Sequence, residues 1–335
     1  MLFSSLYGVD LGTDTIKLRD KSGEKFLNMR NMIAVRKDSG QVLAIGDAAY
    51  EMYEKAPVSV EVSCPMVGGV IASATNMELV LSYALKEFTS FTRKNSGLCL
   101  AVPSSLTPVE QRAFFNVLST SRHTGHVRLI EKGIADAASI SLPVLSGQGY
   151  MIVNIGADTT EISVLHQGRV ILGETLKTGG RTMDADIVSM VRRKFNISIG
   201  MKTAERLKKN LAFMINGPKL EQKVFGIHTL SGLPKSDIIP SLAVSVAIMD
   251  SADRIIEAVR MVYDRIPPVL MKDIASGGIF LTGGVSMILN FPVYMQKQLG
   301  LTVYHIQDPR NSTIRGLLNI INDKELLSLT HLPTL

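Results

Sequence analysis

Apolar and polar residues alternate in two regions of the chain, 9–18 and 153–172, and a turn containing glycine interrupts each region. Such alternation around a turn is typical of β-hairpins. The regions also repeat, because residues 9–15 read VDLGTDT and residues 153–159 read VNIGADT, an offset of 154 − 10 = 144 residues. The pattern therefore predicts a duplicated α/β fold in which each half begins with a strand, a glycine turn and a second strand.

Helical periodicity follows in both halves. In the first half it predicts helices over 77–91 and from Pro108, with Thr107 as the N-cap. In the second half it predicts helices over 184–195, 203–214 and 240–263, the second of them capped by Thr203. A short buried strand is expected at 278–281. No Pro-, Gly- or Ser-rich linker separates the halves, so we expect two lobes with a central cleft and a shared interface able to hinge.

The composition is that of a well-filled globular protein, with 46% hydrophobic and 20% charged residues among 335. The only cysteines, Cys64 and Cys99, lack metal-binding spacing and indicate a reduced, cytosolic compartment. Asp10 interrupts the apolar N-terminal residues before a secretory signal could form, and no apolar run is long enough to span a bilayer. We expect a soluble protein.

The net charge is +6, and much of the basic excess lies between residues 192 and 235. Such a stretch could bind nucleic acid or anionic lipid. Solvated helix faces are the favoured interpretation, because Glu205 is interleaved with the basic residues and no aromatic residues accompany them. We therefore expect no nucleic-acid partner.

The two glycine turns carry the candidate chemistry. A residue without Cβ lets main-chain amides converge on an anion, and threonine hydroxyls at 13, 15, 159 and 160 add donors. Asp10 would organise a divalent cation through water beside such an anion. A single turn favours a purely structural role, whereas two equivalent turns in a duplicated fold favour a bound polyphosphate.

A third candidate follows the strand at 278–281. Gly283 and Gly284 would let the backbone pass close to a purine or ribose, although a simple tight turn explains them equally well. Glu205 and Lys208 share a helical face and could reach the same ligand, but in isolation a surface ion pair explains them better.

Nine segments, in this order, carry a family resemblance: YGVDLGTDTIKL, PMVGGVIA, AVPSSLTPVEQRA, RLIEKGIADAASISLPV, VNIGADTTEISVLHQGRVI, GGRTMDADIVSMVRRKF, IGMKTAERLKKNLA, IFLTGGVSMILNFP and QDPRNSTIRG. They resemble the MreB family of bacterial actin homologues over essentially the whole chain. The resemblance implies an α/β fold of the actin/Hsp70 ATPase type. This fold has two lobes around a nucleotide cleft, each with a duplicated RNase H-like core and a small inserted subdomain. Lobe I would comprise 1–140 and 312–335, with its insertion at about 31–64, and lobe II 141–311, with its insertion at about 176–241.

The resemblance also implies a function. ATP or ADP with Mg²⁺ would bind in the cleft, and the chain would polymerise with itself, including into paired filaments. These filaments would lie in the cytoplasm at the inner face of the cell membrane, where they govern cell shape and wall synthesis. Other MreB-type paralogues and cell-wall elongation proteins are the implied partners.

Carried over position by position, the resemblance places Gly12 and Thr13 in the first phosphate loop and Gly156, Thr159 and Thr160 in the second. It assigns Glu205 and Lys208 to the ribose and base contacts, and Gly283 and Gly284 to the adenosine loop. Asp10 would hold Mg²⁺ through water. The complete expected set is Asp10, Gly12, Thr13, Asp14, Thr15, Gly156, Ala157, Asp158, Thr159, Thr160, Gly180, Glu205, Lys208, Gly283, Gly284 and Val285.

Three positions depart from the family pattern. Asn154 stands where an aspartate usually opens the second phosphate loop, and Lys132 stands where a glutamate usually orients the hydrolytic water. Gly68 replaces a usual acid. Phosphate binding need not suffer, since Lys132 could contact a phosphate as a point charge. Hydrolysis should suffer, because lysine cannot orient water or accept its proton as glutamate does.

These departures predict a divergent paralogue that binds nucleotide and hydrolyses it slowly or not at all. Alternatively, Glu131 or Asp136 has taken over the catalytic role; Glu131 is expected on the same helix as Lys132, pointing about 100° away.

The sequence has three rival functions to the filament subunit. A sugar or acetate kinase needs a catalytic acid and substrate-binding insertions that are not evident. A DnaK-type chaperone needs a peptide-binding domain, which we do not expect here. A non-polymerising adaptor resembling FtsA or PilM, with nucleotide as a conformational lock, remains the main alternative.

Contact with an anionic membrane is a separate expectation. The candidate anchors are Leu2, Phe3 and Leu6 and the loop at 88–94, in which Phe88 and Phe91 precede a basic pair. The competing interpretation is that Leu6 begins the first strand and Phe88 packs in a core.

Overall fold

The computed structural model describes residues 5–89, 96–119 and 126–332. The chain forms two compact units. The first contains residues 1–148, 163–174 and 310–335, and the second contains residues 149–162 and 175–309. The lobe boundaries expected from the sequence stay a prediction.

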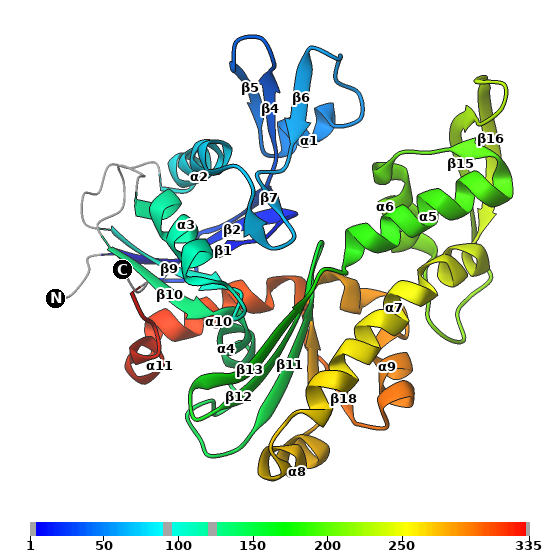
Figure 1. Cartoon of the computed structure of the whole chain (residues 1–335). Helices are drawn as coiled ribbons and strands as arrows, with labels where there is room; N and C mark the ends of the chain where they lie inside the picture. The colour runs from blue at the N-terminus through cyan, green and yellow to red at the C-terminus, as the bar shows by residue number, and fades with distance from the viewer. Residues whose placement is uncertain (1–4, 90–95, 120–125, 333–335) are drawn as a thin grey trace. The chain divides into compact units, whose positions relative to one another are not determined.

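The first unit is built on a five-stranded sheet with the order β10-β9-β1-β2-β3 (Figure 1). Strands β1, β2 and β3 are antiparallel neighbours, whereas β9 runs parallel to both β1 and β10. The bounds are β1 (Ser5–Leu11), β2 (Thr15–Asp20), β3 (Phe26–Arg30), β9 (Ser96–Val102) and β10 (His126–Glu131).

Helices cover this sheet because their apolar faces need burial. α2 and α3 pack in one core with β1 and β2, which includes Val9, Leu18, Leu81 and Phe114, all at most 1% exposed. α10 packs on β1 and on α4. The helices are α2 (Ala74–Thr89), α3 (Pro108–Ser119), α4 (Lys132–Ala138), α10 (Ser312–Asn322) and α11 (Lys324–Ser328).

A smaller sheet with the order β5-β4-β6 lies within residues 33–63 of the first unit. It packs with the short helix α1 through a separate apolar cluster that includes Met32, Ala34 and Ala49. The elements are β4 (Ile33–Arg36), β5 (Val42–Ile45), α1 (Asp47–Met52) and β6 (Val60–Ser63), followed by the two-stranded ribbon β7 (Met66–Val67) and β8 (Val70–Ile71).

The second five-stranded sheet repeats the topology of the first. Its order, β13-β12-β11-β17-β18, matches β3-β2-β1-β9-β10, so the duplication expected from the sequence is confirmed in the fold. The bounds are β11 (Tyr150–Ile155), β12 (Thr160–His166), β13 (Arg169–Leu176), β17 (Ile279–Thr282) and β18 (Val303–His305). Strands β12 and β13 each contain residues of both units.

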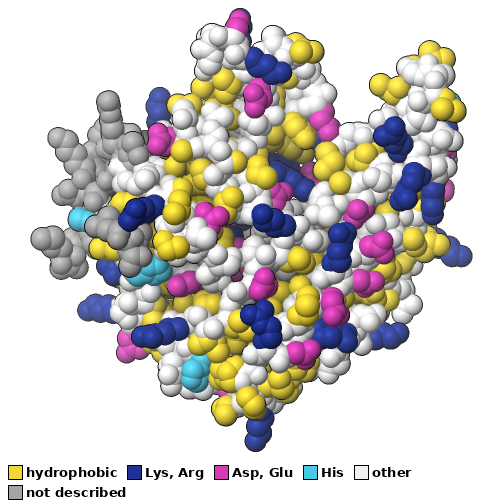
Figure 2. All heavy atoms as spheres, viewed as in Figure 1, with side chains coloured by type: hydrophobic (Ala, Val, Ile, Leu, Met, Phe, Trp, Pro, Cys, Tyr) yellow, Lys and Arg dark blue, Asp and Glu magenta, His cyan; other side chains and the backbone are white. Residues whose placement is uncertain are grey.

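The helices of the second unit are α5 (Gly180–Phe195), α6 (Met201–Leu211), α7 (Ser241–Asp264), α8 (Pro268–Gly277) and α9 (Phe291–Leu299), with the 3₁₀ turn η1 (Gly284–Met287). The 3₁₀ turn η2 (Pro309–Asn311) begins at the last residue of the second unit and continues into the first. A small sheet with the order β14-β15-β16 comprises β14 (Ile197–Ser198), β15 (Glu221–His228) and β16 (Pro234–Pro240). The β15–β16 hairpin exposes Phe225 and, in its turn, Leu230, which are 71% and 86% exposed; hydrophobic side chains are visible at its end (Figure 2).

Most expected helices are confirmed, with ends that shift by a few residues. Thr107 and Glu110 cap the start of α3 reciprocally. The Thr107 main-chain amide donates to the Glu110 carboxylate at 2.8 Å, and the Glu110 main-chain amide donates to the Thr107 hydroxyl. Helix α5 begins at Gly180, four residues earlier than expected. The expectation that Thr203 caps its helix is wrong, because α6 already begins at Met201 and its N-cap is Gly200.

Two candidate membrane anchors are buried. Leu6 is 5% exposed and Phe88 is 7% exposed, and Phe88 packs with Tyr7 edge to face. The core interpretation therefore holds for both, whereas Leu2, Phe3 and residues 90–94 lie outside the described residues. Among the helices that the structure describes, none is long and apolar enough to cross a membrane.

Candidate functional site

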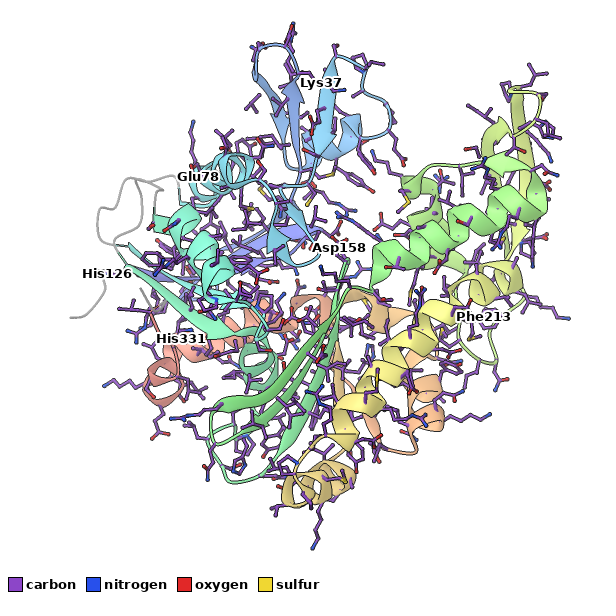
Figure 3. The ribbon with its side chains drawn as sticks, in the orientation of Figure 1. Lys37, Glu78, His126, Asp158, Phe213 and His331 are labelled. Atoms are coloured by element: carbon purple, nitrogen blue, oxygen red, sulfur yellow. The ribbon has the colours of Figure 1, made fainter. Side chains whose placement is uncertain are left out.

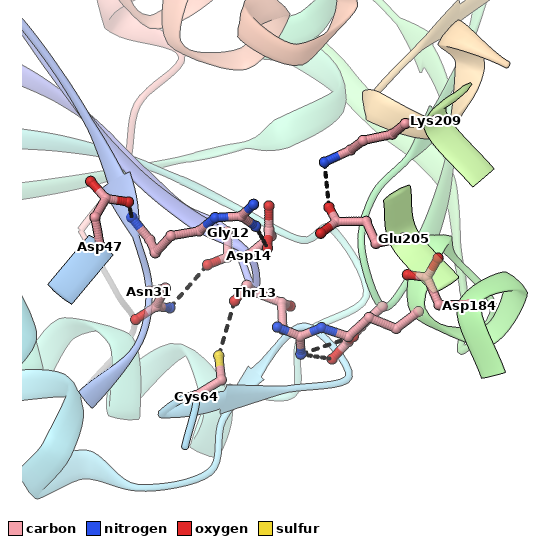
Figure 4. Close-up of polar contacts among 12 residues, drawn as sticks. Gly12, Thr13, Asp14, Asn31, Asp47, Cys64, Asp184, Glu205 and Lys209 are labelled. Carbon is pink, nitrogen blue, oxygen red and sulfur yellow. Dashed lines mark hydrogen bonds and ion pairs between the residues drawn. The ribbon is translucent and has the colours of Figure 1, made fainter. Parts of the chain in front are cut away.

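The first glycine turn joins β1 to β2 and is fixed by its own main chain. The Gly12 amide donates to the Thr15 carbonyl at 3.0 Å. The Asn31 side-chain amide donates to the Gly12 carbonyl at 2.9 Å (Figure 4). A Cβ at position 12 would lie 2.9 Å from the Thr15 carbonyl oxygen. Glycine is therefore required here for close packing within the turn.

The tip of this turn is held by neighbouring elements of the first unit. Asp14 forms an ion pair with Arg30 at the end of β3, and the Cys64 thiol lies 2.9 Å from the Thr13 carbonyl oxygen (Figure 4). Thr13 is only 7% exposed. The tip is thus a fixed structure rather than a free loop.

The second turn repeats the hydrogen bond of the first. The Gly156 amide donates to the Thr159 carbonyl at 2.8 Å, and a Cβ at position 156 would lie 3.1 Å from that carbonyl oxygen. The Thr160 hydroxyl donates to the Thr178 carbonyl at 2.8 Å. Because both glycine amides are used inside their turns, an anion bound at either turn would need other donors.

The start of α5 docks on this second turn. The Gly180 amide donates to the Gly156 carbonyl at 3.0 Å, and the Arg181 amide donates to the Ala157 carbonyl at 2.7 Å. The Arg181 guanidinium also lies 3.2 Å from the carboxylate of Asp158, the tip residue labelled in Figure 3. The sequence indicated the turn but not its arginine partner.

Three expected nucleotide contacts gather beside the second turn, all within the second unit. A Cβ added at Gly180 would lie 3.2 Å from Lys208 Nζ and 3.3 Å from a methyl carbon of Val285. Lys208 Nζ donates to the Gly180 carbonyl at 2.6 Å. Glycine at 180 thus brings the start of α5, the middle of α6 and η1 into contact.

Lys208 is buried rather than paired with Glu205 at the surface. Its ammonium lies 2.7 Å from Asp184 of α5, and both side chains are less than 10% exposed. Burial raises the pKa of Asp184, and the charge of Lys208 and its hydrogen bond oppose that shift. Glu205 instead forms an ion pair with Lys209, its neighbour one helical turn further on (Figure 4).

Gly283 occupies a position that only glycine tolerates. Its φ is +87°, and a Cβ would lie 2.3 Å from the Ile155 carbonyl oxygen at the end of β11. The Ser286 hydroxyl donates to the Gly283 carbonyl at 2.6 Å. Gly283 therefore packs directly against the main chain of β11, the strand that leads into the second turn.

The carboxylate of Asp10 lies between two lysines of the first unit. Lys17 Nζ is 3.4 Å from Asp10 Oδ2, and Lys132 Nζ is 3.8 Å from Asp10 Oδ1. The side chains of Asp10, Lys17 and Lys132 are 7%, 11% and 15% exposed. Lys17 also donates to the Arg310 carbonyl at 2.6 Å.

These surroundings do not suit a divalent cation. Mg²⁺ takes oxygen ligands, whereas ammonium groups offer only donors and repel a cation. Both oxygens of the Asp10 carboxylate already face an ammonium group. Across the described ranges, no group of three or more His, Cys, Asp or Glu side chains is placed to hold a metal ion. The donor set at Asp10 therefore does not fit the Mg²⁺ expected from the sequence.

The two alternative catalytic acids occupy other positions. Glu131 is the last residue of β10 and pairs with Val102 of β9, so the expectation that it lies on the helix of Lys132 is wrong. Asp136 is fully buried and accepts hydrogen bonds from the Ser312 and Thr313 hydroxyls at 2.8 and 2.7 Å. Its carboxylate thus joins α4 to α10.

The two remaining departures from the family pattern lie in a strand and in a turn. Asn154 is in β11, opposite Thr282 of β17. Gly68 is in the turn between β7 and β8 with φ of +59°, a conformation that glycine adopts without strain.

Comparison with known proteins identifies the family. A family model described as "MreB/Mbl protein" matches residues 4–328. The cell shape-determining protein MreB of Haemophilus influenzae is 32% identical over 324 residues, which are 94% of this chain and 92% of that protein. The cell shape-determining protein Mbl of Bacillus subtilis is 28% identical over 94% of this chain and 95% of its own length.

Solved structures agree with this result. MreB5 of Spiroplasma citri bound to AMPPNP superposes with a TM-score of 0.91 at 27% identity and covers 98% of both chains. Its ADP-bound structure gives 0.88 at 28% identity, covering 93% of this chain and 94% of that chain. The MamK double helical filament, with a TM-score of 0.79 at 19% identity over 95% of this chain and 99% of that chain, supports the fold alone. The chain has the actin-like fold predicted from its sequence and belongs to the MreB/Mbl family of cell shape-determining actin homologues.

Proposed function

We propose that this chain is an MreB-type filament subunit that binds ATP or ADP and hydrolyses ATP slowly or not at all. The observation that carries the proposal is the matched pair of glycine turns, Gly12–Thr15 and Gly156–Thr159, which repeat both a sequence pattern and a hydrogen bond. Its relatives support nucleotide as the ligand, since the MreB5 structures contain AMPPNP and ADP.

The proposed contacts follow from the side chains near each turn. Lys132 and Lys17 offer ammonium donors to phosphate beside the first turn. Gly180, Lys208 and Val285, gathered beside the second turn, support adenosine binding there. Mg²⁺ at Asp10 stays a prediction of the sequence, and the two lysines count against it.

Slow hydrolysis follows from the chemistry of two side chains. Attack on a phosphate requires a group that orients water and accepts its proton. Lys132 carries only donors, and the side chain of Asn154 is a neutral amide. The hydrogen bonds that Asp136 accepts from Ser312 and Thr313 in the packing of α4 on α10 count against that role for Asp136.

Filament formation is the assembly that we propose, with a second copy of the chain as the partner. The exposed apolar side chains of the β15–β16 hairpin support self-association, because contiguous exposed apolar surface marks interaction sites. The filaments would lie in the cytoplasm at the inner face of the membrane, together with MreB-type paralogues and cell-wall elongation proteins. Peripheral membrane contact would come from Leu2, Phe3 and the loop that contains Phe91.

A non-polymerising adaptor is the second candidate function. Lys132, which forms an ion pair with Asp10, favours it, because lysine cannot orient the hydrolytic water. A protein that uses nucleotide as a conformational lock does not need to hydrolyse it. Such an adaptor would bind nucleotide with the same residues but would not assemble.

Electron microscopy of the purified chain with ATP tests the proposal against this alternative. We expect filaments, singly or in pairs, that are absent without nucleotide. Dispersed particles under all nucleotide conditions, together with normal nucleotide binding, would favour the adaptor.

A further inference from the structure

Two side chains hold consecutive carbonyl groups of the first glycine turn. The Asn31 side-chain amide, between β3 and β4, donates to the Gly12 carbonyl at 2.9 Å. The Cys64 thiol, directly after β6, lies 2.9 Å from the Thr13 carbonyl oxygen (Figure 4). Asn31 is fully buried, and its main-chain amide donates to the Asp14 carbonyl at 2.9 Å. The carbonyls of residues 12 to 14 are therefore all directed towards these two residues.

The orientation of these carbonyls determines where the amides that follow them point. In a trans peptide the carbonyl and the next amide point in opposite directions. The amides of Thr13 and Asp14 therefore point away from the side chains of Asn31 and Cys64. Within the ranges that the structure describes, neither amide donates to a main-chain carbonyl. Since the Gly12 amide is used inside the turn, these two amides are main-chain donors that the turn can offer to a phosphate.

The second turn holds the equivalent two carbonyls by other means. Gly156 and Ala157 are the counterparts, in the 144-residue repeat, of the residues whose carbonyls accept from side chains in the first turn. The Gly156 carbonyl accepts from the Gly180 amide at 3.0 Å, at the start of α5. The Ala157 carbonyl accepts from the Arg181 amide at 2.7 Å. Main-chain groups thus fix in one turn the same two peptides that side chains fix in the other, which indicates that their orientation is a requirement of the turn.

We propose that Asn31 and Cys64 are positioning residues for nucleotide binding, which direct the amides of Thr13 and Asp14 towards the phosphates without touching the ligand. The inference rests on the proposed nucleotide binding and adds two residues that the sequence did not indicate for it. Loss of either donor leaves a peptide of the turn without its fixed orientation. The affinity for the phosphates should then fall, whereas the adenosine contacts proposed in the second unit should be unaffected.

Asn31→Ala tests the role of the side-chain amide, with isothermal titration calorimetry of the whole chain against ATP and, separately, adenosine. We expect the affinity for ATP to fall about tenfold and the affinity for adenosine to change less than about twofold. Asn319→Ala is the matched control, because the Asn319 side-chain amide also donates to a main-chain carbonyl of the first unit, at 2.8 Å. It should leave both affinities unchanged.

The two ligands separate a positioning role from a general structural one. Unchanged affinity for ATP in Asn31→Ala, or an equal loss for ATP and adenosine, would overturn the inference while leaving nucleotide binding intact. Absence of ATP binding by the unaltered chain would overturn the proposed function, and this inference with it.

Cys64→Ala and Cys64→Ser give a second, independent test. Alanine removes the donor, whereas a serine hydroxyl can still donate to the Thr13 carbonyl. We expect Cys64→Ala to bind ATP at least about threefold more weakly and Cys64→Ser to stay within about twofold of the unaltered chain. Equal affinities of the two variants for ATP would overturn the role of Cys64. Circular dichroism verifies the folding of each variant, and the comparison of alanine with serine stands even if Asn31→Ala does not fold.

Discussion

Lys132, the first residue of α4, limits the hydrolytic chemistry that is available beside the first glycine turn. Its ammonium lies 3.8 Å from Asp10 Oδ1 and can donate hydrogen bonds but cannot accept a proton. Lys132→Glu combined with Asn154→Asp restores two carboxylates, and we expect phosphate release from ATP to rise at least about tenfold. A coupled phosphate assay with MgCl₂ measures this. Unchanged turnover would instead favour a catalytic role for Glu131 or Asp136, and Lys55→Glu controls for charge reversal.

The buried pair of Lys208 and Asp184 is expected to matter for stability as well as for the ligand. Lys208→Met leaves a buried carboxylate unpaired and should lower the free energy of unfolding at neutral pH by about 3 to 5 kcal/mol. Urea denaturation measures the change. Lys209→Met, at an adjacent exposed position, should cost far less.

The loss in Lys208→Met should also depend on pH. The folded-state pKa of Asp184 is raised by burial, and removal of Lys208 removes the charge and hydrogen bond that oppose this shift. An acid with a raised folded pKa binds protons more tightly when folded, so its destabilising effect grows as pH rises above the ordinary value of 3.8. The variant should therefore be less destabilised near pH 4 than at pH 7. An equal loss at both values would contradict this assignment.

Candidate residues differ in how far the sequence could reveal their partners. Lys17 could have been found, because a hairpin whose turn spans Gly12 to Thr15 places residue 17 opposite residue 10, as the register shows. The pairing of Asp184 with Lys208 could not have been found from the sequence, because it depends on how α5 packs on α6. The sequence identifies a local turn well, but it does not give contacts between helices.

Among the elements of the first unit, helices α10 and α4 pack closely against each other. A Cβ at Gly316 would lie 1.6 Å from the Ala135 carbonyl oxygen, which is main-chain and cannot move independently. Gly316→Ala should therefore lower the free energy of unfolding by about 3 kcal/mol, the upper end of the usual cost of overpacking, measured by urea denaturation. Gly147→Ala is the control, because nothing lies within 4 Å of its added Cβ. A small effect at position 316 would mean that the two helices separate easily.

Strands and helices with strong local signals were predictable, and their ends were less so. The β11–β12 turn and the α3 cap follow from residue types within a few positions of each other. The early start of α5 does not, because Gly180 is helical through its hydrogen bond to Gly156 of a distant turn. The buried state of Lys208, in a stretch that reads as solvated helix, likewise comes from tertiary packing.

At the scale of the whole molecule, membrane contact is expected to combine weak apolar anchors with a net charge of +6. The chain should sediment with vesicles that contain anionic lipid and much less with neutral vesicles. Phe3→Ser and Phe91→Ser should each weaken this binding. Undiminished sedimentation of both variants would eliminate these two anchors.

The account as a whole depends on a nucleotide that is bound but not turned over. Phosphate release by the unaltered chain, assembled with saturating ATP and MgCl₂, tests this most directly when the same sample is analysed for bound nucleotide. We expect bound ATP with phosphate release close to the rate without protein. Sustained release of many phosphates per subunit would contradict the assigned roles of Lys132 and Asn154.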